Sequence, residues 1–169
     1  MKKYVFREYS NKYPQLFNKE KQKLRKIIPK NARIEHVGSS AIPGVGGKGI
    51  IDILIAVKKE QLKKVRGILL NNNYLLMHNA PSRISFQKDY GIWFLKRRVH
   101  IHLTTPRSKT WNEHTIFKKN LLNNKKIREE YIKLKKKAVE KAKGTGKIYK
   151  AYKNKFIKKY SKHYESRNP

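Results

Sequence analysis

The sequence predicts an α+β fold with a single hydrophobic core. Three observations support this prediction. A lysine-rich segment with helical apolar spacing comes first, short strand-like runs fill the middle, and the residues from 108 onward show helical periodicity alone. The chain has 169 residues, enough for one domain with a core. We therefore predict one domain over residues 1–169, with a sheet core at about 32–104 and a helical tail at about 108–164.

The first half of the chain predicts a helix, two strands and a second helix. Ser10 precedes an amphipathic lysine-rich pattern that Pro29 ends. The run at 50–57 is almost wholly apolar, as in a buried central strand. Apolar residues at helical spacing then continue as far as the breaker at 71–73. The expected elements are a helix at 11–28, strands at 32–38 and 50–57, and a helix at 59–71.

The second half predicts short strands followed by helices. The segment at 89–91, Asp-Tyr-Gly, is typical of a turn, and Pro106 ends the last strand. In the tail, Thr110 and Glu113 match a capping box at a helix start. The expected strands are 74–77, 83–88, 92–95 and 97–104, with helices from 108 onward.

The composition excludes several classes of protein. Cysteine is absent, which excludes disulfides and thiolate metal sites. There is neither a long apolar run nor the apolar core of a signal peptide, so we expect a cytoplasmic protein without a membrane partner. The formal net charge is +32, from 43 Lys and Arg against 11 Asp and Glu. Such a charge attracts polyanions, but the joint abundance of Lys, Asn, Ile and Tyr also indicates a compositional bias.

The strongest functional signal is a Gly-Ser turn between two predicted strands. Gly38 would let a phosphate approach the backbone, while Ser39 and Ser40 would donate hydroxyl hydrogen bonds to it. The same residues would equally suit a helix N-cap, because serine is a preferred capping residue. The glycines at 44–49 match a dinucleotide-binding motif by letter, but they lead into a strand instead of a helix, so we reject that motif.

One acid and two histidines are the candidate chemical groups. Asp52 stands in an otherwise apolar strand, where a carboxylate is costly to bury unless it is paired or metal-bound. The alternative is a plain ion pair with Lys48 or Arg98. His100 and His102 alternate with apolar residues and therefore share one strand face. They would suit a metal or a phosphate, or they form an ordinary pair on a half-buried strand.

These residues resemble the signature of the GrpB family. The stretches 35–45 and 48–53 are similar to that family's EHVGST-A-[VI]-PGL and KPIIDI, and 100–103 looks like its H-x-H strand. The resemblance spans most of the chain. It implies a nucleotidyltransferase fold of the polymerase β type, with a mixed sheet and flanking helices. In working members of that superfamily, a Gly-Ser turn cradles a triphosphate and three carboxylates hold two Mg²⁺ ions for nucleotidyl transfer.

The resemblance also implies roles for individual residues. Gly38 and Ser39 match the turn, Asp52 matches the first carboxylate, and Lys48 matches a family lysine suited to neutralising phosphate charge. The second carboxylate position holds Leu54, and the later strand carries histidines in place of an acid. Mg²⁺ prefers oxygen ligands, whereas imidazole suits Mn²⁺ or Zn²⁺, so the implied cofactor is a divalent metal: Mg²⁺, Mn²⁺ or Zn²⁺.

Our leading hypothesis is a protein of nucleotidyltransferase fold that binds a nucleoside triphosphate. Metal-dependent nucleotidyl transfer is a candidate activity that the incomplete carboxylate set leaves open. The alternative is a catalytically inactive transferase fold that binds RNA or polyphosphate through its charge. The segment at 93–98 interleaves aromatic and cationic residues, as would suit stacking on bases. The predicted phosphate-binding residues are Gly38, Ser39, Ser40, Lys48 and Arg98, and the predicted catalytic and metal-binding residues are Asp52, His100 and His102.

Overall fold

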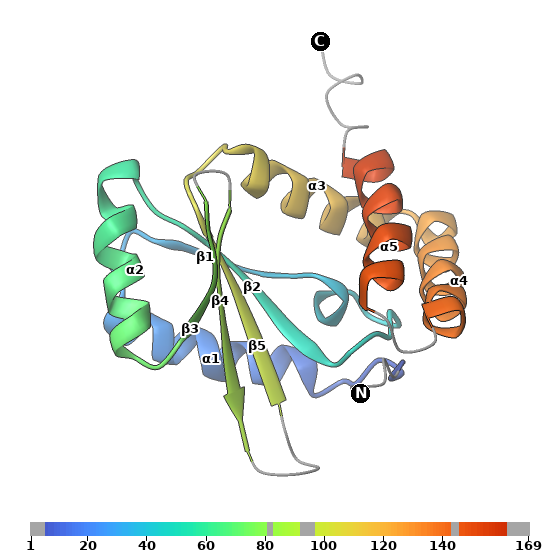
Figure 1. Cartoon of the computed structure of the whole chain (residues 1–169), viewed down its shortest axis with the longest axis horizontal. Helices are drawn as coiled ribbons and strands as arrows, with labels where there is room; N and C mark the ends of the chain where they lie inside the picture. Colours follow the sequence, from blue (N-terminus) through green and yellow to red (C-terminus); the bar gives the residue numbers. More distant parts are fainter. Residues whose placement is uncertain (1–5, 81–82, 92–96, 143–145, 162–169) are drawn as a thin grey trace.

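A computed structural model of the chain describes residues 6–80, 83–91, 97–142 and 146–161. It contains a five-stranded mixed sheet with helices on both faces (Figure 1). The strand order is β1-β2-β5-β4-β3, in which β2 and β5 are parallel and the other neighbours are antiparallel. The predicted α+β fold with a mixed sheet is confirmed.

The helices and strands lie close to their predicted positions. The elements are α1 (Tyr13–Ile27), β1 (Arg33–Val37), the 3₁₀ helix η1 (Ser39–Ala41), β2 (Ile50–Ala56), the 3₁₀ helix η2 (Lys59–Gln61), α2 (Leu62–Asn71), β3 (Leu75–Ala80), β4 (Arg83–Tyr90), β5 (Arg97–Thr104), α3 (Lys109–Asn123), α4 (Lys125–Ala142) and α5 (Gly146–Ser161). No helix among these described elements is both long enough and apolar enough to span a membrane.

One face of the sheet packs against α1 and α2. Because side chains alternate along a strand, every second residue of β2 and β5 enters this core. Ile51 and Ile53 of β2, together with Ile101 of β5, are fully buried there. Phe17 and Leu24 of α1 pack in the same cluster. The remaining residues of β2 and β5, Asp52 and the two strand histidines among them, therefore face the other side of the sheet.

The tail helices cover part of that other face. Trp111 of α3 packs on Val37 and Leu54. Farther along, α3, α4 and α5 bury a second cluster with Ile42 and Val45, which lie in the loop after η1. Figure 1 shows α3 on the opposite side of the sheet from α1, with α4 and α5 beside the loop. The tail therefore lies over the Gly-Ser turn.

The predicted turn at 89–91 is wrong for its first two residues. Asp89 and Tyr90 are extended in β4 and pair with Arg98 and Arg97 of β5. Asp89 also forms an ion pair with the Arg98 side chain, and such cross-strand partners outweigh the turn preference of aspartate. Only Gly91 leaves the strand, with φ +79°. The strand predicted at 92–95, with its aromatic residues, lies outside the described residues.

The predicted capping box at the start of α3 is also wrong. The N-cap is Ser108, two residues earlier than Thr110, and its hydroxyl accepts a hydrogen bond from the Trp111 backbone N–H at 3.1 Å. Thr104 of β5 contacts the same hydroxyl at 2.6 Å. The link from the strand end to Ser108 therefore fixes where α3 begins.

Candidate functional site

Gly38 and Asp52 meet at the end of the β1–β2 pair. Antiparallel pairing places Val37 opposite Asp52, so the turn that follows β1 lies against the carboxylate. Gly38 has φ +71° and ψ −169°, a backbone conformation that is essentially restricted to glycine. A Cβ added at Gly38 would overlap Oδ2 of Asp52 and lie 3.0 Å from its Cβ. The structure thus brings together the turn and the strand acid that the sequence analysis singled out.

The histidine pair lies on the other side of the same carboxylate. Parallel pairing of β2 with β5 sets Asp52 opposite His100. Oδ1 of Asp52 is 3.4 Å from Nδ1 of His100 and 3.9 Å from Nε2 of His102. Burial raises the pKa of Asp52. Hydrogen bonds and charge interactions with His100 and His102 lower it by more than burial raises it, so the pKa of Asp52 is well below its usual range. Asp52 is therefore ionised, with one oxygen facing the turn and the other facing the imidazoles.

His114 of α3 packs against His102, one of the two strand histidines. Its ring centroid is 4.7 Å from that of His102. Burial and then the charge of His102 lower the pKa of His114 to about 3. His114 is therefore neutral near pH 7 and supports the His102 ring without adding a positive charge to the site.

Lys135 of α4 reaches the Gly-Ser turn from the tail. Its side chain is buried, with 1% of its surface exposed. The ammonium donates a hydrogen bond to Oγ of Ser39 at 2.6 Å and another to the backbone carbonyl of Gly46. Burial and then the charge of Lys153 lower the pKa of Lys135 to about 7. A lysine that titrates near neutral pH is thus fixed to the turn.

Lys48 provides a second perturbed ammonium near the turn. Its Nζ lies 4.9 Å from the ring centroid of Tyr149 of α5. Burial and then the charge of Lys150 lower the pKa of Lys48 to about 8, whereas the charge of Asp52 opposes this shift. The predicted Lys48 and the unpredicted Lys135 are therefore both coupled electrostatically to Asp52.

Ser40 and Arg98 already have partners in the structure. Ser40 is buried, and its hydroxyl hydrogen-bonds Nε2 of His36 at 3.0 Å. The Arg98 guanidinium forms two hydrogen bonds to Asp89, each 2.7 Å long. The sequence analysis considered Arg98 as an ion-pair partner for Asp52, but in the structure Arg98 is paired with Asp89.

The donor set does not fit a site for two magnesium ions. Leu54, at the position of the second carboxylate, is fully buried against Val37 and Trp111. Asp52 is accompanied by imidazoles, which are poor ligands for Mg²⁺. Within residues 6–80, 83–91, 97–142 and 146–161, no group of three or more His, Asp and Glu side chains is arranged so that it could hold a metal ion.

Comparison with known proteins identifies the family. The family model described as GrpB protein matches residues 4–163. The chain belongs to the GrpB family. The Glutamate-rich protein GrpB of Alkalihalophilus pseudofirmus is 34% identical over 142 residues, covering 79% of each chain. The UPF0157 protein YqkA of Bacillus subtilis is 30% identical over 132 residues, which cover 76% of this chain but only 37% of YqkA.

Solved structures show that the fold is that of GrpB. The conserved protein GrpB from Enterococcus faecalis superposes with a TM-score of 0.78 at 24% identity, covering 95% of this chain and 99% of that one. The Cid1 poly(U) polymerase with bound MgGTP has a TM-score of 0.47 at 12% identity, over 76% of this chain and 45% of its own. The GrpB resemblance predicted from the sequence motifs is confirmed.

Proposed function

We propose that this GrpB-family protein binds a nucleoside triphosphate at the Gly-Ser turn, with its phosphates against Ser39, Lys48 and Lys135. One observation carries the proposal: the buried Lys135 ammonium is hydrogen-bonded to Ser39, and the same turn adjoins the ionised Asp52. Within the part of the chain that the structure describes, the two hydrogen bonds of Lys135 go to uncharged oxygens. A buried cation without a charged acceptor is stabilised by an anion, and a triphosphate supplies one.

Asp52 alone is proposed as the protein ligand of one divalent cation that arrives with the triphosphate, while His100 and His102 stay beside its carboxylate. Such an ion takes further ligands from the nucleotide phosphates, as is usual where a protein offers a single carboxylate. Nucleotidyl transfer through two magnesium ions would need the second carboxylate, which Leu54 does not provide.

The variant Asp52→Asn should lose the metal-dependent part of triphosphate binding. The substitution keeps the shape of the side chain but removes the charge that holds the cation. Calorimetric titration with each nucleoside triphosphate, with and without Mg²⁺ or Mn²⁺, measures the effect. Asp89→Asn is a matched control, because Asp89 lies on β4, two strands away from β2, and pairs with Arg98. Equal metal-dependent binding by the wild type and Asp52→Asn would exclude the assignment of Asp52.

Triphosphate affinity should fall as the pH rises from about 6.5 to about 9. The pKa values of Lys135 and Lys48 are about 7 and about 8, so both ammonium groups lose their protons in this interval. Loss of a charged hydrogen bond to phosphate weakens binding about tenfold or more. Titrations at several pH values test this. Lys135→Met should remove the lower of the two steps, and an affinity independent of pH would contradict the proposed contacts.

A further inference from the structure

A basic groove lies along α1, on the opposite face of the sheet from Asp52. Its volume is about 730 Å³, and it is lined by lysines and arginines together with Asn18 and Gln22, without an acid. Three of the lysines, Lys19, Lys23 and Lys26, are exposed residues of α1. The groove is distinct from the Gly-Ser turn, because the α1 core separates the two. Nothing in the proposed function uses it.

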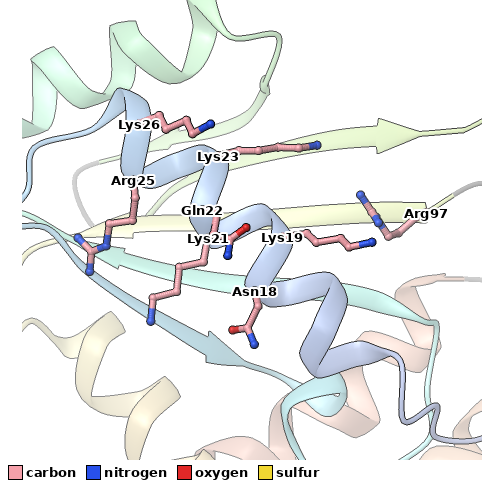
Figure 2. A pocket seen from close by; sticks show the side chains of 8 residues that line it. All are labelled: Asn18, Lys19, Lys21, Gln22, Lys23, Arg25, Lys26 and Arg97. Atoms are coloured by element: carbon pink, nitrogen blue, oxygen red, sulfur yellow. The ribbon is translucent and has the colours of Figure 1, made fainter.

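The groove continues into a second cavity. Figure 2 shows Lys19, Lys23 and Lys26 on the side of α1 nearest Arg97, while Lys21 and Arg25 point to the other side of the helix. The second cavity, of about 240 Å³, shares Lys23 and Lys26 with the groove and adds Lys88 of β4. Cations from one helix and two strands therefore line a single continuous path.

An aromatic ring holds several of these cations close together. The centroid of Tyr90 is 4.4 Å from Nζ of Lys23 and 4.7 Å from the guanidinium of Arg97, with Lys88 at 5.4 Å. The acid beside Lys23 is Glu20, whose Oε2 lies 3.8 Å from the Lys23 Nζ. Glu20 is fully buried and accepts hydrogen bonds from Tyr90 and Tyr74, whereas Asp89 of β4 is paired with Arg98. The surface of the path is therefore positive, and mutual repulsion of its cations is relieved by a bound polyanion.

We propose that this path binds the phosphodiester backbone of a single nucleic-acid strand. Lys19, Lys23 and Lys26 form a row about 10 Å long on one side of α1, which is long enough to contact more than one phosphate of a single strand at once. A protein partner is disfavoured, because the centres of protein interfaces are depleted of lysine. Insertion into a membrane is disfavoured as well, because the apolar face of α1, with Phe17 and Leu24, is buried in the core.

The inference is tested with a triple variant, Lys19→Gln, Lys23→Gln and Lys26→Gln. Glutamine removes each charge without placing a new carboxylate beside Glu20. The probes are a short labelled oligouridylate and the deoxythymidylate of the same length, titrated by fluorescence anisotropy over a range of salt. The variant should bind at least about tenfold more weakly at about 0.1 M salt, and the slope of log K against log salt should shrink by about two.

A charge-matched variant makes the result specific to the groove. Lys126, Lys133 and Lys137 are exposed on α4, and their replacement by glutamine removes the same charge from another surface. Retained binding by this control supports the proposal, and a preference between the two probes identifies RNA or DNA as the strand. Equal losses in both variants, or no loss in the groove variant, would overturn it. The proposal would also be overturned if the groove variant lost binding to inorganic polyphosphate or to anionic vesicles while the wild type bound neither oligonucleotide.

Triphosphate titration of the groove variant should be unchanged, which separates this test from that of the Gly-Ser turn.

Discussion

Replacement of Gly38 by alanine should displace the Asp52 carboxylate and abolish metal-dependent triphosphate binding. The new Cβ would occupy the space of Oδ2 of Asp52, and the backbone there is in a conformation that alanine tolerates poorly. Backbone strain and the collision together should lower the free energy of unfolding by about 2–4 kcal/mol. Denaturant unfolding and calorimetric titration of the same preparation measure the two effects.

Gly44→Ala separates strain from collision. Gly44 also has a positive φ, +77°, but a Cβ there would meet nothing within 4 Å. This control should lose about 1–2 kcal/mol of stability from the backbone alone and should keep its affinity for triphosphate. If both glycine variants bind triphosphate like the wild type, the contact between the turn and Asp52 has no part in binding.

Replacement of Glu20 by alanine should cause the larger loss of stability. The buried Glu20 carboxylate accepts hydrogen bonds of 2.6 Å from the hydroxyls of Tyr74 and Tyr90, and so ties α1 to the loop before β3 and to β4. Without it, the buried Tyr74 hydroxyl loses its charged acceptor and a cavity is left. We expect the free energy of unfolding to fall by about 3–5 kcal/mol, because two hydrogen bonds to a carboxylate, each worth about 1.5–3 kcal/mol, are lost.

Tyr90→Phe is the matched control for this prediction. It removes one of the two hydrogen bonds but leaves the carboxylate and the Tyr74 contact in place, so the loss should be about 1–2 kcal/mol. Denaturant unfolding at neutral pH compares the two variants. A loss of less than 1 kcal/mol in Glu20→Ala, roughly the value of one ordinary hydrogen bond, would show that the tyrosines find other acceptors.

The strands of the sheet could be predicted because their sequence pattern is local. In β5, alternation of apolar and polar residues gave the bounds 97–104 that the structure has, and it placed His100 and His102 on one face. The turn at 89–91 failed for a non-local reason. Tyr90 stays in the strand with its hydroxyl on Glu20, a residue 70 positions away. No periodicity in a single sequence reports that contact.

The candidate site could be predicted only in part, for the same reason. The turn and Asp52 lie on adjacent strands, so motif spacing was enough to join them. Lys135 was missed because it is one of many lysines. A signal was present: Lys135 lies four residues after Tyr131 and three before Ala138, on the stripe of α4 that is buried. In a chain with 43 Lys and Arg, a lysine on an apolar stripe is easily read as part of the compositional bias.

The hydrogen bond between Lys135 and Ser39 joins two parts of the chain that are synthesised at different times. The two residues are 96 positions apart, and Lys135 reaches Gly46 across 89. A ribosome therefore releases the turn, the acid and both strand histidines well before the lysine that binds the turn. Contacts of such long sequence separation form late and slowly. A nascent chain halted before α4 would carry the turn without this lysine, so phosphate binding through Lys135 should arise only after α4 has been synthesised.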